Sequence, residues 1–290
     1  MKRPLASIVV ATYNNSKSIT KCINSILKQK FKNFELIIVD DRSEDNTLEL
    51  IEKIKDRKII TIKSKKNLGT PSARNKGIKI AKGKYTFFID GDCTANKTWI
   101  KNGLKTFEKE KCAGVEGKIY YISKNYKPVA SDDFVENKSG NLFLGGNIAY
   151  KTEILKKING FDKKLLRMQD RDLALKVKKF DNIVFCKNMI VYHQKCKVTF
   201  KKRKRVCREI AKTRVLLFKR YNDRSEIFFR IYRPLNLLAT FFPPLIFGAL
   251  FLHKYKTLSD IKTLLYIYPG IILERISLWK TCFKEKIFLI

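Results

Sequence analysis

The chain has 290 residues, of which 44% are hydrophobic, enough for a sizeable core and against wholesale disorder. Its 62 basic and 27 acidic residues give a net charge of +35, so we expect an anionic partner: nucleic acid, an anionic membrane face or a phosphorylated substrate. The seven cysteines include no CxxC pair, which argues against a disulfide framework and a structural zinc site.

Strands and helices alternate through the first half of the sequence. Apolar β-branched runs predict the strands, and apolar residues at helical spacing predict the helices. In chain order we expect a strand at 7–11, a helix near 19–27 with Ser18 as N-cap, a strand at 34–41, a helix near 46–55, a strand at 59–62, a helix at 72–81 stopped by Gly83, and a strand at 85–89. Continuous apolar strands separated by helices indicate an α/β fold with a mostly parallel sheet covered on both faces.

Two pairs of acids follow two of these strands: Asp40 with Asp41, and Asp90 with Asp92. Ligands of parallel α/β sheets bind outside the carboxyl ends of the strands, so both pairs fall where a ligand would be. Asp90 and Asp92 repel each other, and a basic side chain or a divalent cation could lie between them. The first strand–helix turn, ATYNNSKS, contains no glycine, so both the dinucleotide-binding fingerprint and the P-loop are absent.

Six sequence blocks, in this order, resemble family 2 glycosyltransferases of the GT-A fold over roughly residues 5–195. They are SIVVATYNN, FELIIVDDRSEDNT, NLGTPSARNKGIKIAKGKY, FFIDGD, GGNIAYKTEILKKINGF and QDRDL. A single DxD is weak support, because this sequence contains two, whereas six ordered blocks are hard to obtain by chance. The resemblance implies a catalytic domain over 1–195, with nucleotide-sugar binding at about 5–92 and the acceptor side at about 93–195.

The resemblance also implies the donor side of the site. Asp92 would bind Mg²⁺ or Mn²⁺ directly, and Asp90 would contact the ribose or reach the metal through water. Asp41 would accept a hydrogen bond from the nucleotide base, and Arg74 would lie beside the nucleotide and the DxD. Further donor contacts are implied for Ala11, Thr12, Tyr13 and Asn14. A buried core tyrosine and a surface arginine are the structural alternatives for Tyr13 and Arg74.

On the acceptor side, the resemblance implies that Asp170 is the general base, supported by Asp172. Gln169 replaces the acid that usually precedes this base, and a helix start enriched in Asp is the alternative reading. Asn147 would touch the donor sugar or the acceptor. His193 would bind the metal or the diphosphate, or else be a satisfied core histidine. The QxxRW signature of processive synthases is absent, which favours one sugar added per encounter.

The C-terminal third differs in composition. Residues 195–208 contain eight Lys or Arg and no acid, within a basic amphipathic segment that we place at 196–232. An apolar tail follows at 233–290, with 18 uncharged residues at 235–252 and a second apolar segment interrupted by Pro269, Glu274 and Arg275. We expect this helical appendage to bind the anionic cytoplasmic face of a membrane, as an interfacial or spanning element. A solvated basic face, or helices packed on the catalytic domain, are the alternatives.

The expected activity is inverting, metal-dependent transfer of a sugar from a nucleotide-diphosphate donor, most commonly a UDP-sugar, to a lipid-linked or glycan acceptor. A nucleic-acid-binding protein is an alternative suggested by the charge. The basic run, however, contains Phe200 as its single aromatic residue, and no binding module is recognised. A sugar nucleotidyltransferase is another alternative, although such enzymes usually have a glycine-rich loop after the first strand.

Overall fold

The computed structural model describes residues 3–121, 137–194, 199–221 and 272–287. These residues fall into two compact units, 3–121 with 137–194 and 199–221 with 272–287. The uncharged run 235–252 of the predicted membrane tail lies outside the described residues, as do residues 195–198 of the basic run.

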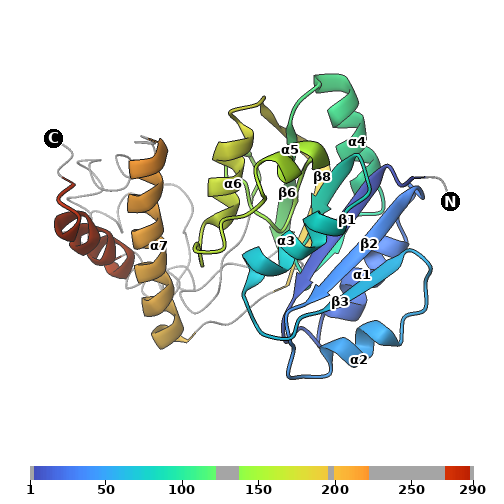
Figure 1. The fold of residues 1–290 in the computed structure, drawn as a ribbon, viewed down its shortest axis with the longest axis horizontal. Helices are drawn as coiled ribbons and strands as arrows, with labels where there is room; N and C mark the ends of the chain where they lie inside the picture. Colours follow the sequence, from blue (N-terminus) through green and yellow to red (C-terminus); the bar gives the residue numbers. More distant parts are fainter. Residues whose placement is uncertain (1–2, 122–136, 195–198, 222–271, 288–290) are drawn as a thin grey trace, which may run out of the picture. The chain divides into compact units, whose positions relative to one another are not determined.

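The first unit is built on one sheet, whose eight described strands are β1 (Ala6–Thr12), β2 (Phe34–Asp40), β3 (Ile59–Lys63), β4 (Tyr85–Phe88), β5 (Cys93–Ala95), β6 (Gly114–Tyr121), β7 (Ile148–Lys151) and β8 (Ile183–His193). Their order across the sheet is β3-β2-β1-β4-β7-β6-β8-β5. Figure 1 shows the neighbouring strands β3, β2 and β1 of this order. The first four strands are mutually parallel, and so are β6 and β8. Strand β7 is antiparallel to β4 and β6, and β5 is antiparallel to β8. The expected parallel arrangement therefore holds for the half formed by β1 to β4, and the whole sheet is mixed.

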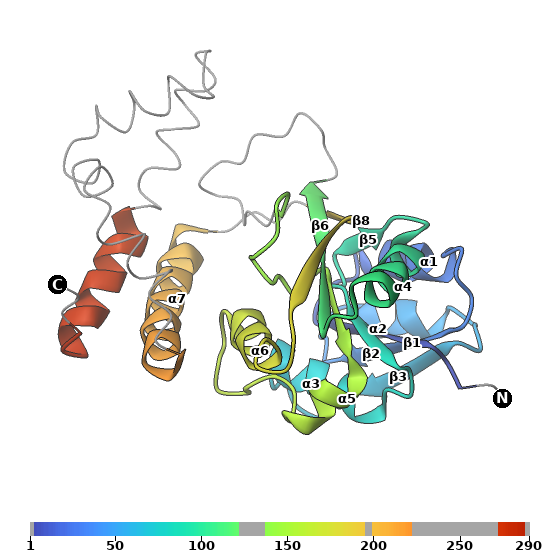
Figure 2. The ribbon, with the colours of Figure 1, turned by 90° about the horizontal axis from the view of Figure 1, so that it is seen from above.

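Two layers of helices cover the sheet. Helices α1 (Ile19–Leu27), α2 (Thr47–Glu52) and α4 (Trp99–Glu110) contribute to one hydrophobic core, and α3 (Thr70–Ile80), α5 (Thr152–Lys157) and α6 (Gln169–Val177) contribute to the other. Because successive strand residues point to opposite faces, Ile8 and Val10 belong to the first core and Val9 to the second. Figure 2 shows α4 and α6 on opposite sides of the sheet.

The helix boundaries differ from the predicted ones at two places. Helix α2 ends at Glu52, so it is shorter than the expected 46–55, and α3 begins at Thr70 with Pro71 in its first turn, where proline costs no hydrogen bond. Ser18 precedes α1 as predicted, but its side chain makes no capping bond. Its hydroxyl instead donates to the carbonyl oxygen of Asn15 at 3.3 Å.

The chain order of the parallel strands creates a switch point beside β1. From β1 the chain proceeds outward to β2 and β3, and then returns to place β4 on the other side of β1. In sheets of this class, ligands bind where the connections from neighbouring strands diverge in this way, at the carboxyl ends of the strands. Thr12 ends β1 and Asp90 follows β4, so both lie at this point.

The second unit contains α7 (Phe200–Tyr221) and a helix at 272–284. Ala211 and Val215 of α7 pack against Leu278 and Cys282 of the other helix. Both figures show the two helices side by side, α7 in orange and 272–284 in red. Of the helices within the described residues, none combines the length and apolar character needed to span a bilayer.

Candidate active site

Arg74 joins two of the predicted acids that lie far apart in the sequence. Its Nη2 donates to Asp90 Oδ1 at 2.7 Å, and its Nη1 binds Asp170 Oδ1. Asp90 follows β4, whereas Asp170 lies in the first turn of α6. The guanidinium is 3% exposed and its face lies over the Phe161 ring, 5.3 Å from the ring centroid. The structure thus brings the first acid of the DxD and the predicted base together through a single buried cation.

The charges in this cluster offset one another. Burial raises the pKa of Asp170, Arg74 lowers it, and Asp90 adds to the increase. Burial alone would lower the pKa of Arg74, but Asp170 and Asp90 raise it above its ordinary value. Arg74 therefore stays charged, and it compensates two carboxylates that would otherwise destabilise each other.

Two consecutive glycines allow the chain to pass close to this cluster. A Cβ atom at Gly145 would collide with the Arg74 guanidinium and with Asp170, and one at Gly146 would lie 2.9 Å from Asp90 Oδ2. The GGN block thus packs its backbone directly on the charged groups. This explains in physical terms why glycines occupy this part of the predicted acceptor loop.

Asp92, the second acid of the DxD, lies close to His193. Asp92 Oδ2 lies 3.5 Å from His193 Nε2, and the pairing of β5 with β8 places Cys93 opposite His193. His193 Nδ1 lies 2.5 Å from the carbonyl oxygen of Gln194, which can only accept, so Nδ1 carries the proton and a neutral ring has its lone pair on Nε2. One ligand atom from each of Asp92, Cys93 and His193 lies within 4.8 Å of the other two.

This donor set fits a divalent cation held by Asp92 and His193. Burial raises the pKa of Asp92, His193 opposes the increase and Asp90 adds to it, so a nearby positive ion would relieve the cost of the carboxylate charge. Burial also raises the pKa of the Cys93 thiol well above its ordinary value, which keeps the thiol protonated and makes it a poor ligand. Carboxylate and imidazole are suitable ligands for Mn²⁺, and carboxylate alone for Mg²⁺.

Asp41 has one carboxylate oxygen engaged by the protein and one without a partner. Oδ2 accepts hydrogen bonds from the backbone N–H groups of Leu68 and Gly69 at 3.0 and 2.6 Å. Oδ1 is buried and has no hydrogen-bond partner, and the residue is 3% exposed. The neighbouring Asp40 is engaged locally, since it accepts from the Ser43 N–H at 3.0 Å and from the Ser43 hydroxyl at 2.5 Å. A buried acceptor without a donor is costly, so Asp41 Oδ1 is suited to a ligand N–H.

The turn after β1 holds the remaining predicted donor contacts. Tyr13 is 41% exposed, so it is not a core tyrosine, and Ala11 is partly buried. Thr12 is buried and its hydroxyl accepts a hydrogen bond from the Asn15 side chain at 3.0 Å. Asn14 adopts a positive φ of 53°, and its side-chain oxygen accepts from the Glu44 N–H at 2.8 Å. The turn is therefore tied to the loop after β2 by its own side chains.

Asn147 and Asp172 lie inside the protein. Both are 0% exposed. The Asn147 side chain accepts from Trp99 Nε1 at 2.8 Å and donates to the carbonyl oxygens of Lys118 and Met189 at 2.9 and 2.8 Å. Asp172 pairs with Lys176 one turn along α6 at 2.7 Å. These contacts engage both side chains within the protein, and the expected contact of Asn147 with the sugar or the acceptor stays a prediction.

Glu116 supports the candidate site and was not predicted, because its only signal in the sequence is an acid within strand β6. Its carboxylate accepts from the backbone N–H groups of Asn141, Leu142 and Phe143 at 2.7, 3.0 and 2.5 Å, and from the Asn137 side chain at 2.8 Å. Burial raises the pKa of Glu116, and these hydrogen bonds lower it. Glu116 thereby fixes the segment that leads into Gly145 and Gly146.

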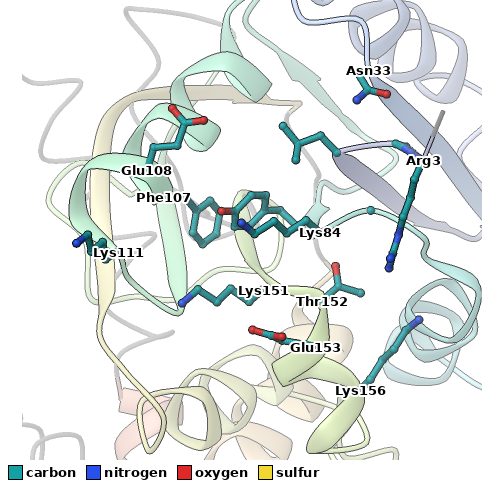
Figure 3. A pocket seen from close by; sticks show the side chains of 14 residues that line it. Arg3, Asn33, Lys84, Phe107, Glu108, Lys111, Lys151, Thr152, Glu153 and Lys156 are labelled. Carbon is teal, nitrogen blue, oxygen red and sulfur yellow. The ribbon is translucent and has the colours of Figure 1, made fainter.

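A separate cavity of about 980 Å³ lies at the opposite, amino ends of the strands (Figure 3). Arg3 and Lys84 line it beside the starts of β1 and β4, and the rings of Tyr85 and Phe107 stack within it with their centroids 4.2 Å apart. None of the predicted site residues lines this cavity. The candidate active site is therefore the cluster of charged residues at the carboxyl ends.

Proteins with similar sequences include named glycosyltransferases. The chain is 43% identical over 122 residues to the Escherichia coli UDP-Glc:alpha-D-GlcNAc-diphosphoundecaprenol beta-1,3-glucosyltransferase WfaP, a match covering 42% of this chain and 48% of WfaP. It is 35% identical over 191 residues to the uncharacterized glycosyltransferase MJ1057 of Methanocaldococcus jannaschii, covering 61% and 65% of the two chains. The matched regions thus span about half to two thirds of these relatives.

Solved structures share the fold at lower identity. Staphylococcus aureus TarS 1–349 in complex with UDP superposes with a TM-score of 0.55 at 22% identity, covering 97% of this chain and 91% of TarS 1–349. The mannosyltransferase PcManGT of Pyrobaculum calidifontis, in complex with GDP-Man and Mn²⁺, gives 0.66 at 16% identity, covering 96% and 88%. Both likenesses support a mixed α/β sheet of the GT-A type. Residues 7–169, more than half of the chain, match the family described as Glycosyl transferase family 2, and the chain therefore belongs to that family.

Proposed function

We propose that this chain transfers a sugar from a nucleotide-diphosphate sugar, in the first instance a UDP-sugar, to a lipid-linked or surface-glycan acceptor. We further propose that the transfer inverts the anomeric centre and depends on Mg²⁺ or Mn²⁺. Membership of family 2 supports sugar transfer. The name of the relative WfaP specifies UDP-Glc as donor and a GlcNAc-diphosphoundecaprenol acceptor, which supports the choice of donor and acceptor class.

The observation that carries the proposal is the bridge from Asp90 through Arg74 to Asp170. An inverting displacement needs a base on one side of the anomeric carbon and a stabilised leaving group on the other. The bridge keeps the base candidate and the DxD within the span of one arginine side chain. It also fixes their relative positions before any substrate arrives, which lowers the cost of organising the reaction.

Asp170 accepts the proton of the acceptor hydroxyl as the hydroxyl oxygen attacks the anomeric carbon and the bond to the diphosphate breaks. Burial raises the pKa of Asp170, which makes its carboxylate a stronger base. Arg74 opposes that increase and so favours the ionised form that a base requires. The Arg74 contact also uses Oδ1, which orients the carboxylate.

The donor is oriented by the residues at the ends of β2 and β4. Asp41 Oδ1 accepts an N–H of the nucleotide base, which gives a buried acceptor its missing partner. Asp92 and His193 would hold the divalent cation, and Asp90 is close enough to Asp92 to raise the pKa of its carboxyl group. When bound, such an ion neutralises negative charge on the departing diphosphate.

We place this activity at the cytoplasmic face of a membrane. The support is in the sequence: eight basic residues at 195–208, and an uncharged run at 235–252 that lies outside the described residues. Basic segments beside an anionic leaflet contribute about 1 kcal/mol per residue to membrane binding. The inferred diphospholipid-linked acceptor would be presented at the same surface.

The test combines donor binding with transfer. UDP with Mn²⁺ should raise the melting temperature of the full chain, because a ligand that binds only the folded state stabilises it. Asp92→Asn should lose the Mn²⁺-dependent part of this shift. Asp170→Asn should keep the shift but lower UDP release from a UDP-sugar, with a membrane lipid extract as acceptor, by roughly 10²- to 10⁴-fold.

The exposed Glu110→Gln is the matched acid-to-amide control and should behave as the unaltered chain. Circular dichroism would establish that each variant is folded. The proposal would be contradicted if folded Asp92→Asn and Asp170→Asn chains kept full transfer with a donor whose binding the thermal shift had confirmed.

A further inference from the structure

A groove of about 800 Å³ runs along the two helices of the second unit. The helices are held together by the packing of Ala211 and Val215 on Leu278, and by two ion pairs. Arg214 binds Glu274, and Lys219 Nζ lies 2.6 Å from Glu285 Oε2. The groove is thus formed by a packed pair of helices with its own small core.

The charge in this groove is almost entirely positive. Six basic residues line it, Lys204, Arg208, Lys212 and Lys219 from α7 and Lys280 and Lys284 from residues 272–284. The single acid in the lining, Glu285, is already paired with Lys219. Within the described residues, no ion pair involves any of the other five cations. An anionic group entering here would meet several uncompensated cations.

The lining also contains an apolar strip. Its members are Val215 and Leu216 of α7 and Leu273 and Ile276 of the second helix; Val215 is buried in the small core, and Ile276 is 39% exposed. On α7 the basic lining residues recur at i, i+4 and i+8, and Val215 falls on the same stripe, so cations and apolar side chains share one face. A free inorganic anion would use only the cations of such a surface and leave the apolar strip in water.

We propose that this groove binds an anionic phospholipid, with the phosphate held by the lysines and arginine and part of an acyl chain on the apolar strip. Charge complementarity and the apolar strip together favour this ligand. The described lining contains no aromatic side chain on which nucleic-acid bases could stack, which makes single-stranded nucleic acid a poorer match.

The position of the helices in the sequence agrees with this occupant. They flank residues 222–271, which include the uncharged run 235–252. The inference therefore rests on the proposed membrane association and deepens it, because it assigns the headgroup contact to one groove. It does not depend on the identity of the donor or of the acceptor.

The experiment measures binding of the full chain to phosphatidylcholine vesicles with and without phosphatidylglycerol. The readout is the ratio of the two binding constants, which removes any contribution of apolar segments common to both vesicles. Arg208→Gln with Lys212→Gln removes two groove cations, and Lys202→Gln with Arg205→Gln removes the same charges from exposed α7 positions outside the groove. About 1 kcal/mol per basic residue corresponds to roughly a 25-fold fall in the ratio for the groove pair.

The matched control pair should lower the ratio clearly less than the groove pair, because its side chains do not line the groove. A second groove pair from the other helix, Lys280→Gln with Lys284→Gln, should reproduce the fall and guards against a local folding defect in α7. If the groove pair and the control pair lower the ratio of binding constants equally, the proposed groove site is wrong. The binding would then come from diffuse electrostatic attraction. Competition by inorganic phosphate or by DNA as effective as by a short-chain phosphatidic acid would overturn a lipid ligand.

The thermal shift produced by UDP with Mn²⁺ distinguishes a failure of the lipid-binding proposal from a failure of the sugar-transfer proposal. The groove variants should retain the thermal shift produced by UDP and Mn²⁺, since these residues belong to the second unit. Loss of lipid selectivity with the shift intact supports the groove whatever the catalytic outcome. If both groove variants keep the selectivity for phosphatidylglycerol vesicles, the proposed lipid site is wrong, even if sugar transfer is confirmed.

Discussion

Asp45 links the turn after β1 to the turn after β2. Its carboxylate accepts from the Ser16 N–H at 3.1 Å and from the Thr47 N–H at 3.0 Å, and it also binds the Thr47 hydroxyl. The same hydroxyl accepts from the Asn15 N–H at 2.7 Å. Burial opposes ionisation of Asp45, but the hydrogen bonds from Thr47 and Ser16 outweigh it and lower the pKa of Asp45 from 3.8 to about 2.

We therefore predict a pH-dependent contribution of Asp45 to stability. Because the folded-state pKa is lower than the unfolded one, the stabilisation is present above about pH 4 and is lost as the pH falls from 3.8 to about 2. Asp45→Asn should lower the free energy of unfolding above pH 4 by about 1 kcal/mol, as expected for one net hydrogen bond. Urea unfolding at a series of pH values would show the difference shrinking on acidification.

The neighbouring Glu44→Gln removes a carboxylate from an exposed side chain and serves as the control. Its difference from the unaltered chain should not follow the same pH window. A destabilisation by Asp45→Asn that is constant from neutral pH down to about pH 2 would contradict the assignment of the hydrogen bonds to the ionised form.

Individual site residues were predictable to different degrees. The acids at 41, 90 and 92 stand out because they end apolar runs, where a fold of this class binds its ligands. The contact of Arg74 with Asp170 could not be predicted from spacing, since it joins α3 to α6. The internal role of Asn147 also needed coordinates, because its three partners come from Trp99, Lys118 and Met189.

At the scale of elements, residues 137–147, which lead into β7, pack on the charged groups of the candidate active site. Glu116, within β6, binds three successive backbone N–H groups of this segment, of which Asn141 and Phe143 have positive φ angles of 65° and 54°. Non-glycine residues rarely adopt this conformation, so the carboxylate stabilises a backbone that would otherwise relax. The glycines that touch Arg74 and Asp90 follow directly.

We predict that Glu116→Gln loosens this segment. A glutamine has one acceptor oxygen in place of two, so at least one backbone N–H loses its partner, at a cost of about 1–3 kcal/mol. Hydrogen exchange at the amides of Asn141, Leu142 and Phe143 should accelerate, and UDP release from a UDP-sugar should fall. Exchange rates unchanged from those of the unaltered chain, with Glu110→Gln as the matched control, would show that Glu116 does not hold the segment.

At the scale of elements, the parallel half of the sheet was predictable and the other half was not. Strands β1 to β4 coincide with apolar β-branched runs separated by helical patterns. Strand β5 has three residues and β7 has four, too short for a periodic signal. The insertion of β7 beside β4, which pairs Phe87 with Ala149, is a non-local choice that no local pattern encodes.

At the scale of the whole molecule, the part of the chain that matches the family corresponds to one of the two compact units. Residues 7–169 match the family, and the described residues among them belong to the first unit. The net charge of +35 belongs to the whole chain, and it was the feature that kept a nucleic-acid-binding function open. Charge of this size attracts any polyanion, so binding to nucleic acid alone does not distinguish a function.

The salt dependence of binding distinguishes non-specific nucleic-acid binding from nucleotide binding at the candidate active site. Non-specific DNA binding releases counterions, so a chain making six to ten phosphate contacts loses roughly 10³- to 10⁵-fold in affinity between about 50 and 200 mM salt. UDP with Mn²⁺ should weaken less than about tenfold over the same range, because it uses few charges and a directed bond to Asp41 Oδ1. Fluorescence anisotropy of a labelled oligonucleotide and the UDP thermal shift, measured at several salt concentrations on one preparation, would give the salt dependence of each affinity. Tight oligonucleotide binding at high salt without any UDP response would instead favour nucleic acid as the ligand of this chain.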